Sequence, residues 1–320
     1  MAVVRGRLNL SLLKLPALAL SDECPRFIPF VPPSDTKNAA TVTIPASELE
    51  KLEVLGRGNG GTVYKVQHKG TSNIYALKVV HGVGDQNIYK QFLRERDILR
   101  KTESPYIVRC FETYEKPSGE VALLLEYMDG GTLDTFLRHH GWFSEPEVAH
   151  MTRQVLEGLV YLHSNKIMHR DTKPSNLLVT NKNMEVKIAD FGVSKVTTLP
   201  LDPRNSYVGT CAYMSPERFD PDSNGGNYDG FLGDIWSLGV TAMELYMGHF
   251  PLLPPDQNPS WITLMCAICF GDPPSLPSGA SDEFQHFLDC CLQKEPSKRW
   301  SASQLLGHPF LLKYQGIHIR

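Results

Sequence analysis

The stretch that decides the fold of this 320-residue chain reads His169-Arg170-Asp171-Thr172-Lys173-Pro174-Ser175-Asn176, and Asp190-Phe191-Gly192 begins fourteen positions after Asn176. Mg2+ prefers an octahedral shell of oxygens and commonly keeps waters while borrowing oxygens from substrate phosphates. Asn176 and Asp190 are therefore candidate Mg2+ ligands. Asp171 is a candidate base that orients an attacking hydroxyl and accepts its proton, and Lys173 can neutralise charge on a transferred phosphate. The spacing predicts phosphoryl transfer.

A glycine-rich turn precedes this stretch and reads Gly56-Arg57-Gly58-Asn59-Gly60-Gly61-Thr62-Val63. Backbone N–H groups without side chains around them can approach phosphate oxygens closely. By itself the pattern also fits an ordinary hairpin, and a dinucleotide-binding turn would need a helix after it. Thr62 and Val63 begin a strand-like run instead, so the setting favours a loop that covers phosphates.

Lys78 ends the hydrophobic run Tyr75-Ala76-Leu77-Lys78. A lysine in an apolar strand is costly unless it meets an anion. Phosphate oxygens on one side and a carboxylate on the other would satisfy it, and Glu95 on the following predicted helix is the natural carboxylate. The alternative is a surface lysine that extends its ammonium group into water.

Composition and charge set limits on function. The chain is 42% hydrophobic, enough for a substantial core, and its net charge of −3 indicates no bulk attraction to nucleic acid or to acidic membranes. Its seven cysteines are an odd, scattered set, unlike the framework of a secreted disulfide-rich protein. We therefore expect a reducing compartment, either cytoplasmic or nuclear.

Four of these cysteines invite a zinc interpretation, because Cys266 and Cys269 are spaced as CxxC and Cys290 and Cys291 follow. The first pair lies in the apolar run 261–270, and adjacent cysteines are poor ligands for one ion. We expect all four to be buried structural thiols.

The pattern along the chain predicts a flexible N-terminal extension, residues 1–46, and then two lobes. Proline-rich sequence from Cys24 to Thr43 predicts an extended tether. Period-two runs and one amphipathic segment predict a small lobe, residues 47–128, with an antiparallel sheet and one helix. The strands are expected at 50–56, 62–68, 74–80, 107–114 and 121–127, and the helix at 88–101.

A larger and mainly helical lobe is expected from 129 to 312, with a short tail at 313–320. Ser144 and Glu147 form a capping box before apolar residues at helical spacing, and Pro146 sits in the first turn. Further helices are predicted at 234–247, 284–293 and 303–306. The fold class is α+β, and there is no uninterrupted apolar stretch long enough to span a membrane.

With these motifs in order, residues 49 to 312 resemble the eukaryotic protein kinase domain. The resemblance implies that ATP binds between the lobes with Mg2+, and that Asp234 braces the catalytic loop while Glu217 pairs with Arg299. It implies an adenine site below Leu55, Val63 and Ala76, and a gatekeeper and hinge at Leu125, Glu126, Tyr127 and Met128.

Lys173, two residues after Asp171, resembles serine/threonine-type kinases. The stretches Asp190-Phe191-Gly192-Val193-Ser194-Lys195, Asn205-Ser206-Tyr207-Val208-Gly209-Thr210 and Tyr213-Met214-Ser215-Pro216-Glu217-Arg218 resemble MAP kinase kinases more specifically. The insert 224–230 and the short C-terminus are similar to the compact plant members of the stress- and ethylene-related group. The resemblance implies a dual-specificity kinase, which we expect to be monomeric, and the net charge gives no reason to expect nucleic-acid or membrane partners. Such a kinase would phosphorylate Thr and Tyr in the loop of a MAP kinase and be activated by a MAP kinase kinase kinase.

The N-terminus carries Arg5 and Arg7 followed by Leu8 and Leu10. These residues resemble the MAP kinase docking motif, in which basic side chains meet an acidic patch and leucines enter an apolar groove. A targeting peptide is the alternative, because the first twenty residues hold basic residues and leucines but no acid.

Regulation is expected at the activation segment. Arg170 would place a guanidinium near the active site, and a phosphate on Ser206, the second phosphosite of the family, could pair with it. The first family phosphosite falls on Pro200, which cannot be phosphorylated. Either Thr197 or Thr198 takes over that role, or one site suffices.

Thr172 is a second departure, because the family usually has an aliphatic residue there. If its hydroxyl were buried without a partner, we would expect reduced stability or rate. Two rival functions stay open: a pseudokinase that serves as a scaffold for MAP kinases, and a serine/threonine kinase of another cascade tier.

Overall fold

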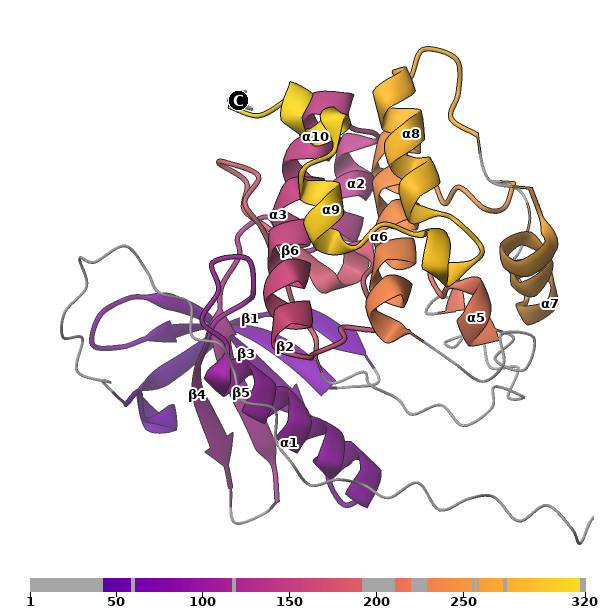
Figure 1. Ribbon diagram of the computed structural model, residues 1–320. Coiled ribbons are helices and arrows are strands. Elements are labelled where there is room, and N and C mark those ends of the chain that lie inside the picture. Colours follow the sequence, from indigo (N-terminus) through magenta and orange to yellow (C-terminus); the bar gives the residue numbers. More distant parts are fainter. Residues whose placement is uncertain are drawn as a thin grey trace, which may run out of the picture.

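The computed structural model of the chain describes residues 43–58, 61–116, 119–191, 211–219, 229–254, 257, 259–272 and 275–316. The N-terminal docking residues and the expected phosphosites lie outside these ranges. The described part forms the two predicted lobes, one built on a β-sheet and one built of helices (Figure 1). The expected α+β class is confirmed.

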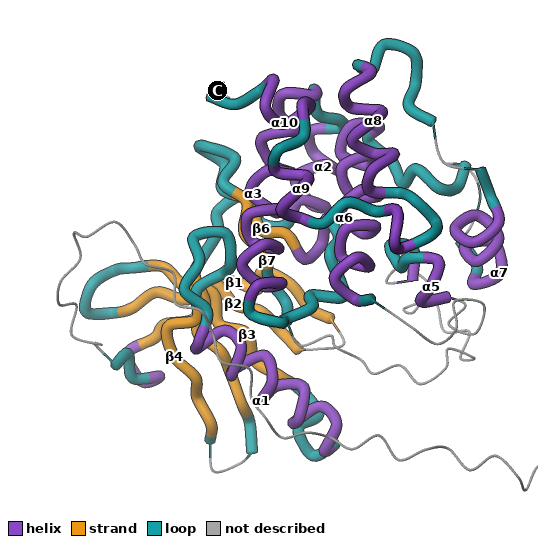
Figure 2. The backbone as a smooth tube through the Cα atoms, viewed as in Figure 1, coloured by secondary structure: helices purple, strands orange, loops and turns teal. Residues whose placement is uncertain are grey.

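The small lobe is built on an antiparallel sheet (Figure 2). Its strands follow the order β1-β2-β3-β5-β4. Side chains alternate between its faces: Leu77 and Leu124 join one buried cluster, and Ala76 and Leu123 join the main core on the other. The strands are β1 (Leu49–Gly58), β2 (Gly61–His68), β3 (Ile74–Val80), β4 (Cys110–Glu115) and β5 (Val121–Glu126), preceded by a 3-10 turn η1 (Ala46–Glu48).

One helix of this lobe, α1 (Gln86–Lys101), lies beside the sheet (Figure 1). Asp85 caps it by accepting a hydrogen bond from the Asn87 amide at 2.7 Å. Phe92 and Leu99 on its buried face join the main core, and Glu95 projects from the same face. The cap and the apolar stripe therefore fix which side of α1 meets the sheet.

The prediction of a strand beginning at Ile107 is wrong, because β4 begins three residues later. Residues 106–108 pair instead with the other lobe. The Val108 amide donates to the Ile188 carbonyl at 3.0 Å, and the Ile188 amide donates to the Tyr106 carbonyl at 2.9 Å. Residues 106–108 do have the apolar character of a strand, but they pair with Ile188, which lies far along the chain.

The large lobe is organised around α3 (Glu145–Ser164) and α6 (Gly230–Met247), which lie side by side with α8, α9 and α10 packed around them (Figure 1). Helix α3 begins at the predicted capping box, in which Ser144 and Glu147 bond reciprocally. The other elements are α2 (Leu133–His140), η2 (Pro174–Asn176), β6 (Leu177–Val179), β7 (Val186–Ile188), α5 (Pro216–Phe219), α7 (Trp261–Met265), η4 (Cys266–Phe270), α8 (Asp282–Cys291), η5 (Pro296–Lys298), α9 (Ala302–Leu306) and α10 (Pro309–Lys313).

Helix α6 is apolar on nearly all sides and forms the centre of this lobe. Asp229 caps its first turn, and Gly248 ends it with a φ of 80°. A Cβ at Gly248 would lie 2.3 Å from the Gly141 carbonyl oxygen, so only glycine fits there.

A fully buried ion pair joins α5 to the loop before α9. The Arg299 guanidinium meets both carboxylate oxygens of Glu217, at 2.7 and 2.8 Å, and lies over the Trp236 ring. The pairing expected from the resemblance is therefore present. In the described part of the chain, every helix is too short or too polar to cross a bilayer.

Candidate active site

The candidate catalytic loop, residues 169–176, is held in place by Asp234 on α6. Its carboxylate accepts hydrogen bonds from the backbone amides of His169 at 2.9 Å and Arg170 at 2.6 Å, and from His163 Nε2 at 2.9 Å. Arg170 has a φ of 68°, a conformation that a non-glycine residue holds only when its surroundings impose it. Asp234 supplies that constraint and so braces the loop.

Asp171 lies at the centre of the loop and is almost fully buried. Its Oδ2 accepts from Asn176 Nδ2 at 2.8 Å and meets Lys173 Nζ at 3.0 Å. Burial raises the pKa of the Asp171 carboxyl, although Lys173 acts in the opposite direction. A carboxylate with a raised pKa in this position can accept a proton from a substrate hydroxyl.

Lys78, Glu95 and Asp190 form an ion-pair cluster across the two lobes. Lys78 Nζ lies 2.8 and 3.0 Å from the two Glu95 oxygens and 2.8 Å from Asp190 Oδ1. Burial alone would lower the pKa of Lys78, but the two carboxylates outweigh it and raise that pKa. The ammonium group is therefore charged and paired, as the sequence predicted, and the surface-lysine alternative is wrong.

Asp190 itself has a φ of 62°. Burial would raise the pKa of its carboxyl, but the attraction of Lys78 outweighs this and lowers it, which keeps the carboxylate ionised. Backbone strain at a residue that must present a charged oxygen is common at functional sites.

The glycine-rich turn between β1 and β2 has two kinds of glycine. A Cβ at Gly56 or Gly58 would meet nothing within 4 Å, whereas a Cβ at Gly61 would lie 2.0 Å from the Val79 carbonyl oxygen. Gly61 is therefore required by the fold, while Gly56 and Gly58 leave open space beside the backbone. Asn59 and Gly60 lie outside the described residues.

The remaining residues expected around a nucleotide belong to the strands that line the junction. Val63 lies on β2 and Ala76 on β3, and these two strands pair with each other. Thr62 is buried, and its hydroxyl lies 2.9 Å from His81 Nε2. Leu55 is exposed. Arg57 lies on β1 opposite Thr62.

The expected hinge leaves β5 at Glu126, and Met128 beyond it is buried. The Glu126 carboxylate bonds Lys187 Nζ at 2.6 Å and the Arg109 amide at 3.3 Å. The side chain of Glu126 therefore ties the lobes together, which leaves only its backbone to face a nucleotide. Lys187, on β7, gave no signal in the sequence.

The donor atoms fit a nucleotide with a divalent cation. Asn176 uses its amide nitrogen on the Asp171 carbonyl and carboxylate, both at 2.8 Å, so its amide oxygen remains as a donor to metal. Together with the Asp190 carboxylate, it offers the hard oxygens that such ions prefer. The open glycine backbone and the charged Lys78 suit phosphate oxygens.

The Thr172 hydroxyl is fully buried, but the concern that it lacks a partner is wrong. It lies 3.2 Å from His169 Nδ1, and His169 Nε2 lies 3.0 Å from the Ala189 carbonyl. A second polar contact that the sequence did not reveal joins Tyr213 to Glu244 on α6 at 2.6 Å. The first contact depends on how the His169 ring is turned, and the second joins residues 31 positions apart, so no spacing rule predicts either of them.

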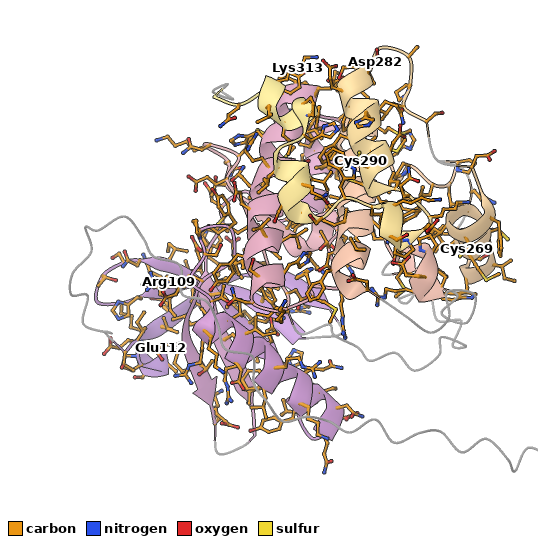
Figure 3. All side chains as sticks on the ribbon, in the orientation of Figure 1. Arg109, Glu112, Cys269, Asp282, Cys290 and Lys313 are labelled. Atoms are coloured by element: carbon orange, nitrogen blue, oxygen red, sulfur yellow. The ribbon has the colours of Figure 1, made fainter. Side chains whose placement is uncertain are left out.

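The four-cysteine zinc interpretation fails on geometry. Cys269 lies near α5 and α7 whereas Cys290 lies on α8 (Figure 3). Cys290 and Cys291 are buried as expected, but the expectation of burial is wrong for Cys266, which is exposed, and Cys269 is only partly buried. The π-helical turn η4 places Cys266 on the outer side while Ile268 fills the core.

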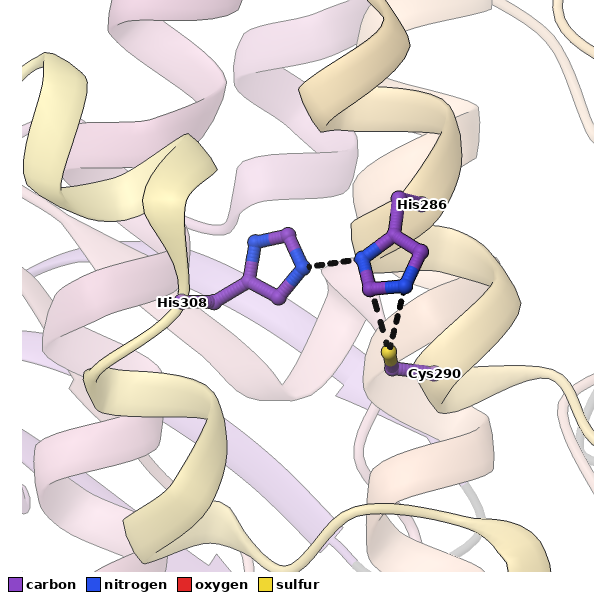
Figure 4. Close-up of side chains that lie close together, drawn as sticks. All are labelled: His286, Cys290 and His308. Atoms are coloured by element: carbon purple, nitrogen blue, oxygen red, sulfur yellow. Dashed lines mark hydrogen bonds between the residues drawn. The ribbon is translucent and has the colours of Figure 1, made fainter.

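A different group, His286, Cys290 and His308, brings potential metal ligands within 4.8 Å of one another (Figure 4). The hydrogen bonds argue against an ion there. The Phe310 amide donates to His308 Nδ1 at 3.1 Å, so the proton of that neutral ring is on Nε2, which donates to His286 Nδ1 at 2.8 Å. A metal-binding histidine normally donates through its second nitrogen, whereas this one accepts. The group is a satisfied hydrogen-bond chain that caps α10.

Two lobes, a braced loop and the Lys78–Glu95–Asp190 cluster together define a protein kinase, and residues 49–311 match the protein kinase domain. The chain is 56% identical over 319 residues to mitogen-activated protein kinase kinase 9 of Arabidopsis thaliana, covering 97% of this chain and 99% of that protein. It is 57% identical to mitogen-activated protein kinase kinase 7 (97% and 99% covered) and 48% identical to kinase kinase 8 (98% and 99%) of the same plant. The chain belongs to the plant MAP kinase kinases.

Proposed function

We propose that the protein is a MAP kinase kinase that transfers the γ-phosphate of ATP to Thr and Tyr in the activation loop of a MAP kinase. The observation that carries this proposal is the intact cluster around Asp171, Asn176, Lys78 and Asp190 in a chain similar over its whole length to MAP kinase kinases. As a protein kinase, it uses ATP and a divalent metal ion.

In the proposed mechanism, Asp171 orients the substrate hydroxyl. Among the described residues, its hydrogen-bond and ion-pair partners meet Oδ2, so Oδ1 is the oxygen that would accept the proton. Lys173 stays close to that carboxylate and offers positive charge to the transferred phosphate. Lys78, held by Glu95, would meet the phosphates of ATP from the side of the small lobe.

Asn176 and Asp190 would hold the metal ion, which we propose is Mg2+, through their side-chain oxygens. When bound, Mg2+ neutralises charge on the phosphate oxygens. The contribution of the chain is to keep Asn176 oriented by its bonds to Asp171 and to keep Asp190 ionised through Lys78.

Phosphorylation of Ser206 is the proposed switch. Arg170 Nε is buried and has no hydrogen-bond partner among the described residues, and its Nη2 approaches only the Met168 sulfur at 3.8 Å. A phosphate on the activation segment, which runs from 193 to 217, would supply the missing partner and tie that segment to the catalytic loop. Thr197 or Thr198 would be the additional site, since Pro200 cannot serve.

A Ser206→Ala variant tests this switch after incubation with an upstream MAP kinase kinase kinase. We expect the parent to gain activity and the variant to stay near its basal rate. Equal activity in the two proteins would show that Ser206 is not the switch. Phosphopeptide mapping of the active parent then distinguishes two sites from one. Phosphate on Thr197 or Thr198 would support two sites, and its absence from both would support Ser206 alone.

Docking of the MAP kinase through Arg5, Arg7, Leu8 and Leu10 is also a proposal. It rests on the basic-leucine pattern alone, because these residues lie outside the described part. Charge reversal at Arg5 and Arg7 should raise KM for a MAP kinase and leave KM for ATP unchanged. A monomeric state and a cytoplasmic or nuclear location remain predictions.

The decisive experiment for the function uses a Ser206→Asp protein, ATP, Mg2+ and a catalytically dead MAP kinase, with Lys78→Met as the matched control. We expect mass spectrometry to find phosphate on both Thr and Tyr of the substrate loop. Phosphate on unrelated serines alone would favour a kinase of another tier. Incorporation no greater than in the control would leave the scaffold interpretation.

A further inference from the structure

His169 lies where two segments of the site meet. Its ring nitrogen Nε2 donates to the Ala189 carbonyl at 3.0 Å, one residue before Asp190. The ring also packs edge-on against Phe191, with centroids 5.2 Å apart and planes at 87°. The imidazole therefore connects the loop that carries Asp171 to the segment that carries Asp190.

Both segments hold a strained residue beside this connection. Arg170, directly after His169, has a φ of 68°, and Asp190, directly after Ala189, has a φ of 62°. A non-glycine residue keeps such a conformation only when neighbouring contacts hold it. The hydrogen bond between His169 and Ala189 therefore joins the residues that directly precede the two strained residues, Arg170 and Asp190.

The hydrogen bonds define the tautomer of the ring. A carbonyl oxygen only accepts, so Nε2 carries the proton when it bonds Ala189. In the neutral ring Nδ1 is then an acceptor, and the Thr172 hydroxyl at 3.2 Å is the donor. These two bonds act on opposite sides of the ring, so together they fix its plane and prevent it from turning over.

Thr172 suits this role because it is fully buried. Water does not reach its hydroxyl, and an aliphatic residue in its place would leave the buried Nδ1 without that donor. The residue that departs from the family pattern is therefore the one that completes the histidine contacts.

We propose that Thr172 is a positioning residue, whose hydroxyl holds His169 in the orientation that keeps the Asp190 segment in register with Asp171. It acts through His169 and touches no substrate. The kinetic part of this inference rests on the proposed function, but the structural part does not.

The test compares three variants of the full chain. Thr172→Val keeps the shape of the side chain and removes the hydroxyl, and Thr172→Ser keeps the hydroxyl. Thr152→Val is the matched control, because Thr152 on α3 is equally buried but its hydroxyl has no hydrogen-bond partner among the described residues.

The first measurement is independent of activity. The Ala189 amide donates to the Asn176 carbonyl at 2.9 Å, so its hydrogen exchange reports opening of this junction. In Thr172→Val we expect exchange at Ala189 to be faster by about 5- to 30-fold, with a changed 15N shift at His169 Nδ1. Thr172→Ser and Thr152→Val should match the parent.

The second measurement is kinetic. We expect Thr172→Val to lower kcat by about 5- to 30-fold while KM for the MAP kinase changes by less than about two-fold, because substrate docking is untouched. Thr172→Ser should restore kcat. If the parent transfers no phosphate, the proposed function fails, and the exchange data still decide the role of Thr172.

Unchanged exchange and kcat in Thr172→Val would overturn the proposal, as would equal changes in Thr172→Val and Thr152→Val. If Thr172→Val does not fold, Thr172→Ala and Thr172→Ser are compared by the same measurements. The proposal is supported if Thr172→Ser matches the parent in exchange and kcat while Thr172→Ala does not. It is overturned if Thr172→Ala matches the parent.

Discussion

Replacing Glu244 by glutamine should stabilise the protein above neutral pH and have little effect at acidic pH. Glu244 is 8% exposed on α6 and accepts a hydrogen bond from the Tyr213 hydroxyl at 2.6 Å. Burial raises the pKa of its carboxyl from 4.5 to about 7, although the Tyr213 bond works in the opposite direction. The folded protein therefore prefers the protonated carboxyl.

The sign and size follow from this shift. Below the unfolded pKa of 4.5 the carboxyl is protonated in both states and costs nothing. As the pH rises from 4.5 to 7, the unfolded state ionises freely and the folded state does not, so stability falls. At 1.36 kcal/mol per pKa unit, the full penalty is about 3 kcal/mol above neutral pH and under about 1 kcal/mol near pH 5.

Urea unfolding of the parent and Glu244→Gln near pH 5 and pH 8 measures this difference. Glutamine stays neutral and its amide oxygen still accepts from Tyr213. We expect the variant to be more stable than the parent by about 3 kcal/mol near pH 8 only. Glu103→Gln, an exposed control, should follow the parent. The reasoning is refuted if Glu244→Gln loses as much stability as the parent between the two pH values.

Other predictions concern the fold around the site. Arg299→Met leaves the buried Glu217 carboxylate unpaired, so it should lower the free energy of unfolding in urea by about 3–5 kcal/mol. Adding Glu217→Leu to this variant should recover part of the loss. Absence of any recovery would argue against the ion pair as the cause. Gly61→Ala places a Cβ 2.0 Å from the Val79 carbonyl oxygen at a φ of 140°, so we expect a loss of about 1–3 kcal/mol in thermal unfolding. Gly58→Ala, where a Cβ meets nothing within 4 Å, should stay within about 0.5 kcal/mol of the parent.

The sequence predicted those features that depend on local spacing. The capping box at Ser144 and Glu147 located the start of α3 because both partners lie within one helical turn. The pairing of Lys78 with Glu95 was predictable because a lysine inside an apolar strand needs an anion nearby. These features require no knowledge of where distant segments meet.

Features set by tertiary contacts were not predictable in the same way. Ile107 was expected in a strand of the small lobe, but that segment pairs with Ile188 of the other lobe. The direction of Cys266 depends on a single π-helical turn, and the partner of Thr172 depends on the orientation of one imidazole ring. The first outcome depends on a partner far along the chain, and the other two depend on local geometry that residue spacing does not encode.

The central claim is that Asp171 directs phosphoryl transfer from ATP to a MAP kinase. Single-turnover transfer by Ser206→Asp protein, with and without Asp171→Asn, tests it most directly, with ATP affinity measured in parallel. We predict that Asp171→Asn slows transfer by about 10²- to 10⁴-fold and leaves ATP affinity within about two-fold. Transfer by Asp171→Asn at close to the rate of the parent would contradict the account.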